Sequence, residues 1–187
     1  MTYIIMAVFA VLILVADQVT KYLTIQNIAP FSSTAFIEKL CASYHIHADM
    51  YQELPGKVEV IPGVISFSHI HNDGGAWGMF DGAIWLFVAI FIAFAIFIVW
   101  EFSKKRMAFD TFERFCIVAV FAGGLGNIID RLRLGFVIDM IQTEFINFPV
   151  FNVADCFITC GCILLIVHLI FFNRAFWKDD KKNDSVC

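Results

Sequence analysis

The chain contains the stretch GNIIDRLRLGFVIDMIQTEFINFPVFNVADCFIT, which runs from Gly126 to Thr159. A strongly apolar run leads into this stretch and another leads out of it. Two aspartates within it, Asp139 and Asp155, therefore lie close to segments that suit hydrocarbon. An ionisable residue in such a place costs free energy, so both aspartates mark a candidate functional site.

The composition indicates a small membrane protein. The 187 residues are 60% hydrophobic, and their mean hydropathy is +0.78. A soluble domain is only about half apolar, so we expect a single helical bundle in a membrane. The formal net charge of −4 is small and gives no reason to expect a nucleic-acid partner.

Apolar segments predict an all-α polytopic membrane protein with four transmembrane helices. They are Tyr3 to about Ile25, Ala83–Trp100, about Phe112 to Ile129 and about Ala154 to Phe172. The second contains no charged residue. The first lacks a basic region and a small-residue cleavage site before Asp17, so we interpret it as a retained helix.

Lys and Arg residues near the membrane ends predict the orientation. EFSKKR (101–106) joins the second and third helices, and Arg174, Lys178, Lys181 and Lys182 follow the fourth. Both basic clusters are expected in the cytoplasm, together with both termini. The segments 26–82 and 130–153, which hold the unusual polar residues, then lie on the outer side.

The outer segment is long. Residues 58–70 alternate in polarity and are rich in β-branched side chains, which predicts short strands. Residues 30–47 favour a loop with one or two helical turns. We expect one membrane-embedded domain over residues 1–176 and a disordered cytoplasmic tail over 177–187.

Asn and Asp residues recur at a helical spacing on either side of Asp139. Asn127 and Asp130 are three residues apart near the end of the third helix, and Asn152 and Asp155 repeat that spacing at the start of the fourth. Helix capping is an alternative explanation, and it accounts well for Asn152.

Under the capping interpretation, Asp130 and Arg131 form an interfacial ion pair. Capping does not explain Asp139, which lies in the strand-like run FVIDMI, or Asp155, which lies beyond the expected cap. We therefore favour a functional role for these two residues. The supporting residues remain open between the two interpretations.

Two carboxylates in one site of low dielectric share a proton, so one serves as acid and the other as base. Such a pair suits amide hydrolysis, although an Asp pair alone is a weak signal. A small transporter or proton-relay protein remains an alternative, as does a lipid-binding scaffold. The sequence contains no HExxH or GxSxG motif.

Other polar and reactive residues favour structural roles. His69 and His71 share a strand face, where we expect an exposed strand edge and not a metal site. His168 is expected to bond a neighbouring helix. We expect the cysteines in apolar runs to pack as small hydrophobic residues. In NDGGAWGMF (72–80) the glycines permit positive φ, and a plain turn with Trp77 as an interfacial anchor explains the segment equally well.

Several motifs together are similar to those of a known family. They are DQVTKYL (17–23), NDGGAWG (72–78), GNIIDRL (126–132) with GFVIDMI (135–141), and FNVADCFIT (151–159). In these residues and their order the chain resembles the lipoprotein signal peptidases, also called signal peptidase II, which are intramembrane aspartic peptidases of bacteria. The outer loop of this chain is longer than expected for that family, with an insertion near residues 30–55.

The resemblance implies that Asp139 and Asp155 are the catalytic pair, without a metal or other cofactor. The implied substrate is a prolipoprotein that carries diacylglyceryl on a cysteine and is cleaved just before it. The implied setting is the bacterial cytoplasmic membrane, with a small outer β-cradle over about 26–82. We also expect lipid contacts, a monomeric state and, from the predicted orientation, an active site near the outer face. The residues at supporting positions are Asp17, Lys21, Asn72, Gly74, Asn127, Asp130, Arg131, Asn152 and Ala154.

Overall fold

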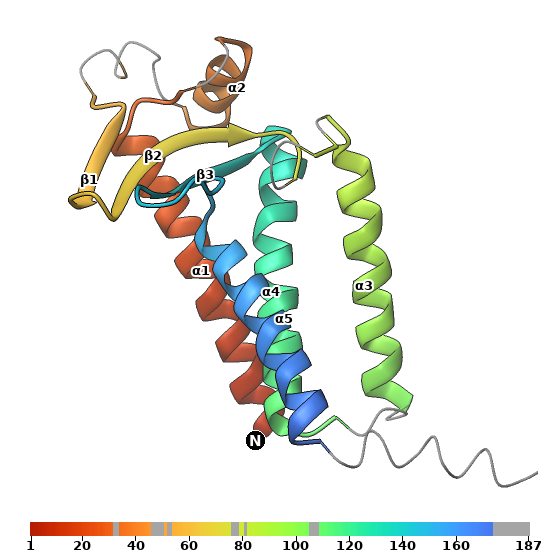
Figure 1. Cartoon of the computed structure of the whole chain (residues 1–187). Coiled ribbons are helices and arrows are strands. Elements are labelled where there is room, and N and C mark those ends of the chain that lie inside the picture. Colours follow the sequence, from red (N-terminus) through yellow and green to blue (C-terminus); the bar gives the residue numbers. More distant parts are fainter. Residues whose placement is uncertain are drawn as a thin grey trace, which may run out of the picture.

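Four long helices and a small sheet make up the protein. The computed structural model describes residues 1–31, 34–45, 51, 54–75, 79–80, 82–104 and 109–173. The elements, in chain order, are α1 (Thr2–Asn27), α2 (Thr34–Tyr44), β1 (Lys57–Ile61), β2 (Ile65–Asn72), α3 (Ile84–Lys104), α4 (Thr111–Leu134), β3 (Val137–Thr143) and α5 (Val153–Phe171). α1, α3, α4 and α5 form a bundle, and the strands cross one end of it (Figure 1).

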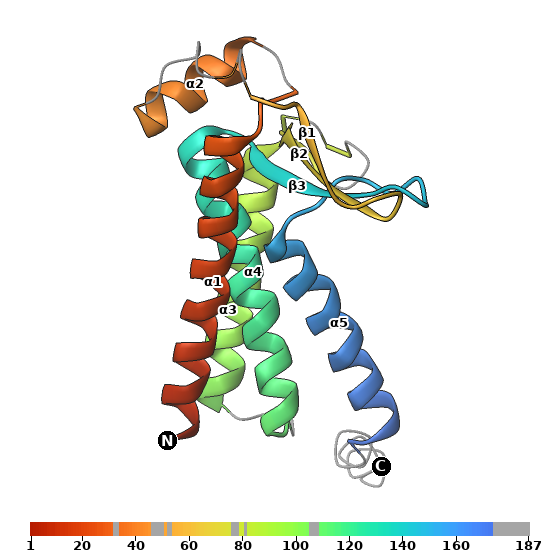
Figure 2. The same cartoon turned by 90° about the vertical axis from the view of Figure 1, so that its left-hand side faces the viewer.

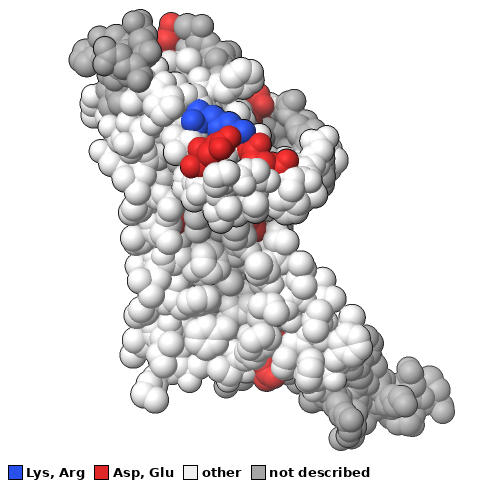
Figure 3. All heavy atoms as spheres, turned by 60° about the vertical axis from the view of Figure 1, so that its left-hand side comes forward, with Lys and Arg blue, Asp and Glu red and all other residues white. Residues whose placement is uncertain are grey.

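The four bundle helices are the ones in the described residues that are long and apolar enough to span a membrane. In the apolar 18-residue stretch of each helix, 56% of the residues are buried in α4, against 17% in α1 and 11% each in α3 and α5. α4 is therefore the central helix, and the others expose apolar surface. On the face shown in Figure 3, most of the charged side chains gather near one end, and an acidic patch lies near the other, with mostly uncharged surface between them. The prediction of four membrane helices with a small sheet is confirmed.

Glycines let α4 approach its neighbours closely. A Cβ added at Gly123 would lie 2.6 Å from the carbonyl oxygen of Ala154 in α5. A Cβ added at Gly126 would lie 2.5 Å from Oδ2 of Asp17 in α1. Small residues serve this purpose between membrane helices, where apolar side chains gain little by leaving lipid. The close approach carries polar groups of α1 and α5 to the same part of α4.

The sheet places two predicted site residues side by side. Its strand order is β1-β2-β3, and both pairings are antiparallel. α4 ends at Gly135, whose φ of 84° is left-handed and whose N–H donates to Arg131 O. This turn leads directly into β3, where Asp139 pairs with Ile70, two residues before Asn72. The end of β2 is therefore adjacent to Asp139, which lies in a strand as predicted.

The insertion in the outer segment forms a helix where the sequence favoured a loop with one or two turns. α2 lies over the sheet end of the bundle (Figure 2). Leu40 of α2 is fully buried in a cluster that includes Leu134 at the end of α4. The guanidinium of Arg133 lies 4.1 Å from the ring centre of Tyr44. α2 therefore covers the end of α4, which local periodicity in a short segment does not reveal.

The expected exposed strand edge at His69 and His71 is wrong, because both rings are buried. His69 Nδ1 donates to Ile28 O at 2.9 Å, so in the neutral ring its Nε2 accepts from His71 Nε2 at 3.1 Å. Burial lowers the pKa of His69 to about 4 and that of His71 to about 3. The His71 ring stacks on Phe136, with ring centres 4.2 Å apart. The pair thus belongs to the core beneath the sheet.

The chain ends bear on the predicted orientation. The N-terminus and the final turn of α5 both lie at the end of the bundle away from the sheet (Figures 1 and 2). Trp77, the basic residues of 105–106 and everything after Asn173, including the tail, lie outside the described residues. The domain limits and the side of the membrane on which the sheet lies therefore remain predictions.

The close approach of α4 and α5 gives a first test. Gly123→Ala should lower the apparent melting temperature in detergent, because overpacking costs about 1–3 kcal/mol where a backbone atom cannot yield. Gly124→Ala is the matched control: its added Cβ would meet only the Phe91 side chain, at 3.1 Å. Equal melting temperatures for the two variants would contradict this account of the packing.

Candidate active site

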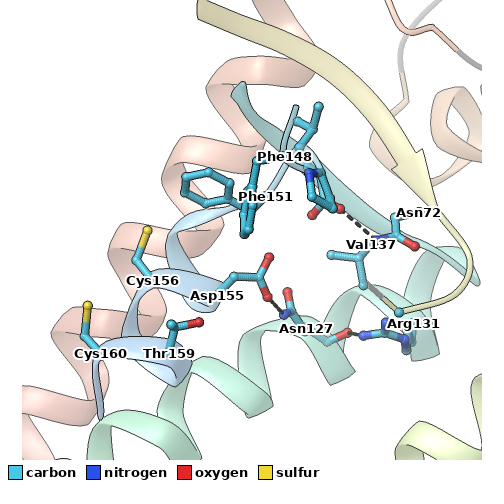
Figure 4. A pocket seen from close by; sticks show the side chains of 14 residues that line it. Asn72, Asn127, Arg131, Val137, Phe148, Phe151, Asp155, Cys156, Thr159 and Cys160 are labelled. Atoms are coloured by element: carbon cyan, nitrogen blue, oxygen red, sulfur yellow. Dashed lines mark hydrogen bonds between the residues drawn. The ribbon is translucent and has the colours of Figure 1, made fainter. Parts of the chain in front are cut away.

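Side chains from several elements surround a pocket of about 420 Å³ at the sheet end of the bundle. β2 supplies Asn72, β3 supplies Asp139, α4 supplies Asn127 and Arg131, and α5 supplies Asp155. The other lining residues are Gly75, Val137, Phe148, Pro149, Val150, Phe151, Cys156, Thr159 and Cys160. Figure 4 shows the amides and the guanidinium on one side, with Cys156, Thr159 and Cys160 on the other. The pocket thus has a polar side and a less polar side.

Asp139 is held by an amide donor at each carboxylate oxygen. Asn152 Nδ2 donates to Asp139 Oδ1 at 2.7 Å, and Asn72 Nδ2 donates to Oδ2 at 2.9 Å. The side chain is 2% exposed. Donors from β2 and from the start of α5 therefore fix the carboxylate against the pocket wall.

Asp155 belongs to the N-terminal capping box of α5. Asn152 is the N-cap, and its Oδ1 accepts from the backbone N–H of Asp155 at 2.9 Å. Asp155 Oδ2 in turn accepts from the backbone N–H of Asn152 at 3.1 Å. Asp155 Oδ1 accepts from Asn127 Nδ2 of α4 at 2.8 Å. Asp155 lies beyond the N-cap, as predicted, but the capping box explains one of its oxygens, contrary to our expectation that capping does not account for Asp155. The neighbouring helix α4 holds the other oxygen.

The amide of Asn127 has only one orientation that satisfies its neighbours. Its Oδ1 accepts from Lys21 Nζ and from Asn152 Nδ2, both at 3.0 Å. Both neighbours are donors, and an ammonium cannot accept a hydrogen bond. The NH2 group of Asn127 must therefore point toward Asp155.

The other two amides are oriented by backbone N–H groups. Asn72 Oδ1 accepts from Gly74 N at 3.0 Å, which turns its NH2 group toward Asp139. Asn152 Oδ1 is occupied by the N–H of Asp155, which likewise turns its NH2 group toward Asp139. All three amides thus present donors to the two carboxylates.

Lys21 anchors this network from behind. Its fully buried ammonium lies 2.9 Å from Asp17 Oδ2, 2.8 Å from Asp130 Oδ2 and 3.0 Å from Asn127 Oδ1. Three donors thus meet three acceptors, which a buried charge requires. Gln18 Nε2 adds bonds to Asp17 at 3.2 Å and Asp130 at 3.1 Å. The cluster locks α1 to α4.

A carboxylate of α1 also binds a backbone N–H in the first turn of α5. Asp17 Oδ1 accepts from Ala154 N at 3.0 Å. The first N–H groups of a helix have no partner within the helix, so this carboxylate satisfies one of them and favours the positive end of the helix dipole. A single carboxylate therefore links α5 to Lys21.

Arg131 holds the chain just after Asn72. Its Nη2 donates to Gly74 O at 2.6 Å, and its guanidinium lies 4.3 Å from the ring centre of Phe87 in α3. The ion pair between Arg131 and Asp130 that the capping alternative offered is not the one found, because the partner of Asp130 is Lys21. Arg131 instead joins α4 to the turn after β2 and to α3.

The electrostatic setting of Asp139 differs from that of a surface carboxyl. Burial, followed by the nearby charge of Asp155, raises the pKa of Asp139 to about 7. The amide donors of Asn72 and Asn152 oppose this rise because they favour the ionised form. Asp139 can therefore carry a proton near neutral pH, as one member of an acid–base pair requires.

All the residues predicted for the site are found together. Those that line the pocket are Asn72, Asn127, Arg131, Asp139 and Asp155, and those directly behind it are Asp17, Lys21, Gly74, Asp130, Asn152 and Ala154. Sequence reasoning missed Gln18 and the apolar wall at 148–151. Gln18 is adjacent to Asp17, which was a usable signal, whereas apolar wall residues carry none.

A second polar cluster lies at the opposite end of the bundle. Glu113 is fully buried and accepts from His168 Nδ1 at 3.0 Å and from Asn173 Nδ2 at 2.8 and 2.9 Å. The expected bond of His168 to a neighbouring helix is confirmed. Asp110, Glu113 and His168 have ligand atoms within 4.8 Å of one another, a spacing that would suit a metal ion. The capping box at the start of α4 holds Asp110 and Glu113 together. The bond between His168 and Glu113 then connects α5 to α4, and these contacts explain the arrangement.

The Lys21 cluster gives a second test. Lys21→Met should destabilise the protein by about 3–5 kcal/mol, because it leaves buried acids without a cation. The double variant Lys21→Met, Asp130→Asn should recover part of the lost melting temperature. The control Lys57→Met removes an exposed pair with Glu144 and should cost about 1 kcal/mol or less. A Lys21→Met variant as stable as Lys57→Met would contradict the role assigned to Lys21.

Comparison with known proteins identifies the family. The family model described as signal peptidase (SPase) II matches residues 9–171. A lipoprotein signal peptidase of Enterococcus faecalis is 35% identical over 162 residues, which cover 85% of this chain and 83% of the relative. The protein of the same name from Lactobacillus johnsonii is 46% identical over 118 residues, 62% of this chain and 74% of the relative.

Solved structures agree with the sequence relatives. One, described as a bacterial membrane enzyme determined by the in meso method at 1.9 Å resolution, is 32% identical with a TM-score of 0.67, and the match covers 90% of this chain and 94% of that one. Another, determined at 2.3 Å, has the same identity and TM-score over 88% and 87% of the two chains. The family model, the sequence relatives and the solved structures all match this chain over most of its length. The chain belongs to the signal peptidase II family.

Proposed function

We propose that this chain is an intramembrane aspartic endopeptidase that removes signal peptides from prolipoproteins. The observation that carries the proposal is the pair Asp139 and Asp155 in one pocket, with each carboxylate oxygen held by a fixed donor. The names of the relatives support the substrate class. Fixed donors keep the acids in place without further rearrangement during the reaction.

The proposed mechanism divides the chemistry between the two acids. Asp155 acts as the base: it removes a proton from water, and the water oxygen bonds to the scissile carbonyl carbon. Asp139, whose pKa is about 7, donates its proton to the carbonyl oxygen. When the tetrahedral intermediate collapses, the C–N bond breaks and the amine takes the proton held by Asp155. As the new carbonyl forms, a hydroxyl proton of the intermediate passes to Asp139, so Asp139 is again protonated and Asp155 is again ionised.

The surroundings of the pocket support a substrate that arrives from the bilayer. Phe148 and Phe151 line the pocket, and Phe145 and Ile146 of the same loop are exposed. α5, which carries Asp155, is one of the membrane-spanning helices. A diacylglyceryl-modified cysteine, with cleavage just before it, fits such an entrance. Every side chain of the site comes from one chain, so the proposal needs no second copy.

The proposed orientation has both termini in the cytoplasm and the pocket near the outer face of the bacterial cytoplasmic membrane. The sheet lies at the opposite end of the bundle from the N-terminus (Figure 1). Because β2 and β3 supply pocket residues, this supports a common side for the site and the outer segment. The transporter or proton-relay alternative is not favoured. Between Arg114 and Asn127 the central helix α4 carries no ionisable side chain except Cys116, so α4 does not supply a chain of proton carriers.

The proposed pair makes a direct prediction. Asp139→Asn and Asp155→Asn should each lower the rate of cleavage of a diacylglyceryl prolipoprotein peptide by at least about 100-fold, the usual worth of general acid–base catalysis. Glu144→Gln is the control, because Glu144 bonds Ser66 and Lys57 outside the pocket. Melting temperatures should show that each variant is folded. A folded variant within about tenfold of the unaltered rate, a barrier change of about 1.4 kcal/mol, would remove that residue from the chemistry.

The pH dependence tests which acid carries the proton. Activity should fall as pH rises through the pKa of Asp139, about 7, because the acid is then ionised. Asn72→Ala removes a donor that favours the ionised form, so the alkaline limb of kcat/KM should shift to higher pH even though the rate falls. Glu144→Gln should leave the limb in place. If the alkaline limb of Asn72→Ala stays in place or shifts to lower pH, Asp139 is not the acid that carries the proton. The pKa measured in this way is the apparent value of the coupled pair.

A further inference from the structure

Two thiols line the pocket that contains the acids. Cys156 and Cys160 are four residues apart on α5, so they share a helix face, and they line the same pocket as Asp155. Figure 4 shows them one below the other along the helix, beside Thr159. Cys160 is exposed and Cys156 is partly buried. The expectation that cysteines pack as small hydrophobic residues therefore does not describe Cys160.

The other described cysteines lie elsewhere. Cys116 is buried in α4 and fits the packing expectation. Cys162 is partly buried and lines a separate cavity of about 120 Å³ between α5, α3 and α4. Cys41 is partly buried against the core beneath α2. Cys156 and Cys160 thus differ from these three by facing the pocket that holds Asp139 and Asp155.

The proposed hydrolysis gives the two thiols no task, because the carboxylates are held by amide and backbone nitrogen donors. The pocket wall around the thiols is apolar, with Phe148, Phe151 and Val150. Since α5 spans the membrane, a molecule that reaches Cys160 from lipid arrives uncharged, because a charge is costly there.

We propose that Cys160, with Cys156 as a second acceptor, is a covalent modification site for uncharged, lipid-soluble α,β-unsaturated carbonyl compounds, and that the adduct blocks the pocket. The sulfur bonds to the β-carbon as the C=C π bond breaks, and the thiol proton ends on the α-carbon. The addition needs no oxidant or reductant. The thiolate is the form that attacks such compounds, and an exposed thiol ionises more readily than one buried in apolar surroundings.

The blocking effect follows from position. A group attached to the Cys160 sulfur extends from the wall of a pocket that also contains Asp155, one and a half turns earlier on the same helix. It therefore occupies volume that a peptide substrate must enter. This step depends on the proposed function, whereas the modification itself does not, so the two are measured separately.

The first experiment reads the modification itself. The full chain in lipid bilayers is treated with N-ethylmaleimide or with a sulfonated maleimide, and adducts at each cysteine are followed by peptide mass spectrometry. Cys160 should react first and at least about tenfold faster than Cys116 or Cys162, as exposure dictates. The sulfonated reagent should react more slowly at Cys160. Equal rates at Cys160 and Cys116, or equal rates for the two reagents at Cys160, would overturn the proposal.

The second experiment measures whether the adduct blocks cleavage, with each variant compared with its own untreated sample. N-ethylmaleimide should abolish cleavage of the prolipoprotein peptide by the unaltered chain and by Cys41→Ala, Cys116→Ala, Cys162→Ala. The variant Cys156→Ala, Cys160→Ala should keep its untreated rate. Full activity with Cys160 modified, or equal inactivation without the two thiols, would overturn the block. If the untreated chain does not cleave, the proposed function fails and the labelling pattern alone decides the thiol site.

Discussion

The buried ammonium of Lys21 is the interaction on which the rest of the structure depends. It joins Asp17 and Asp130, and through Asn127 it reaches the carboxylate of Asp155. A buried ion pair adds little net stability over apolar packing, but breaking one is costly. Its main effect here is specificity: it sets the position of α1 against α4 and leaves one orientation for the Asn127 amide. The geometry of the pocket follows from that orientation.

Polar clusters at the two ends of the bundle position the helices, and small residues close the distance between them. Between membrane helices there is no hydrophobic driving force, so hydrogen bonds and close packing decide the arrangement. At the sheet end the cluster is centred on Lys21, and at the other end it is centred on Glu113, which binds His168 and Asn173. Gly123 allows the backbones of α4 and α5 to meet between these two ends.

The site is built from the rules that end and begin regular elements. Gly135 ends α4 and turns the chain into β3, which places Asp139 a few residues later. Asn152 and Asp155 form the capping box that begins α5, so one carboxylate serves the helix and faces the pocket. A site on element ends is held more rigidly than one on free loops. Function and local folding are therefore served here by the same residues.

The sequence alone determined the four apolar helices, the cap at Asn152 and the free-energy cost of placing Asp139 beside apolar segments. Each of these depends only on residues close together in the chain. Only the tertiary structure decided the partners. Lys21 meets Asn127 across 106 residues, and it takes the place at Asp130 that local reasoning assigned to Arg131. The burial of His69 and the thiols that face the pocket were likewise hidden. A side chain's partner depends on which helix faces pack, and no local pattern records that choice.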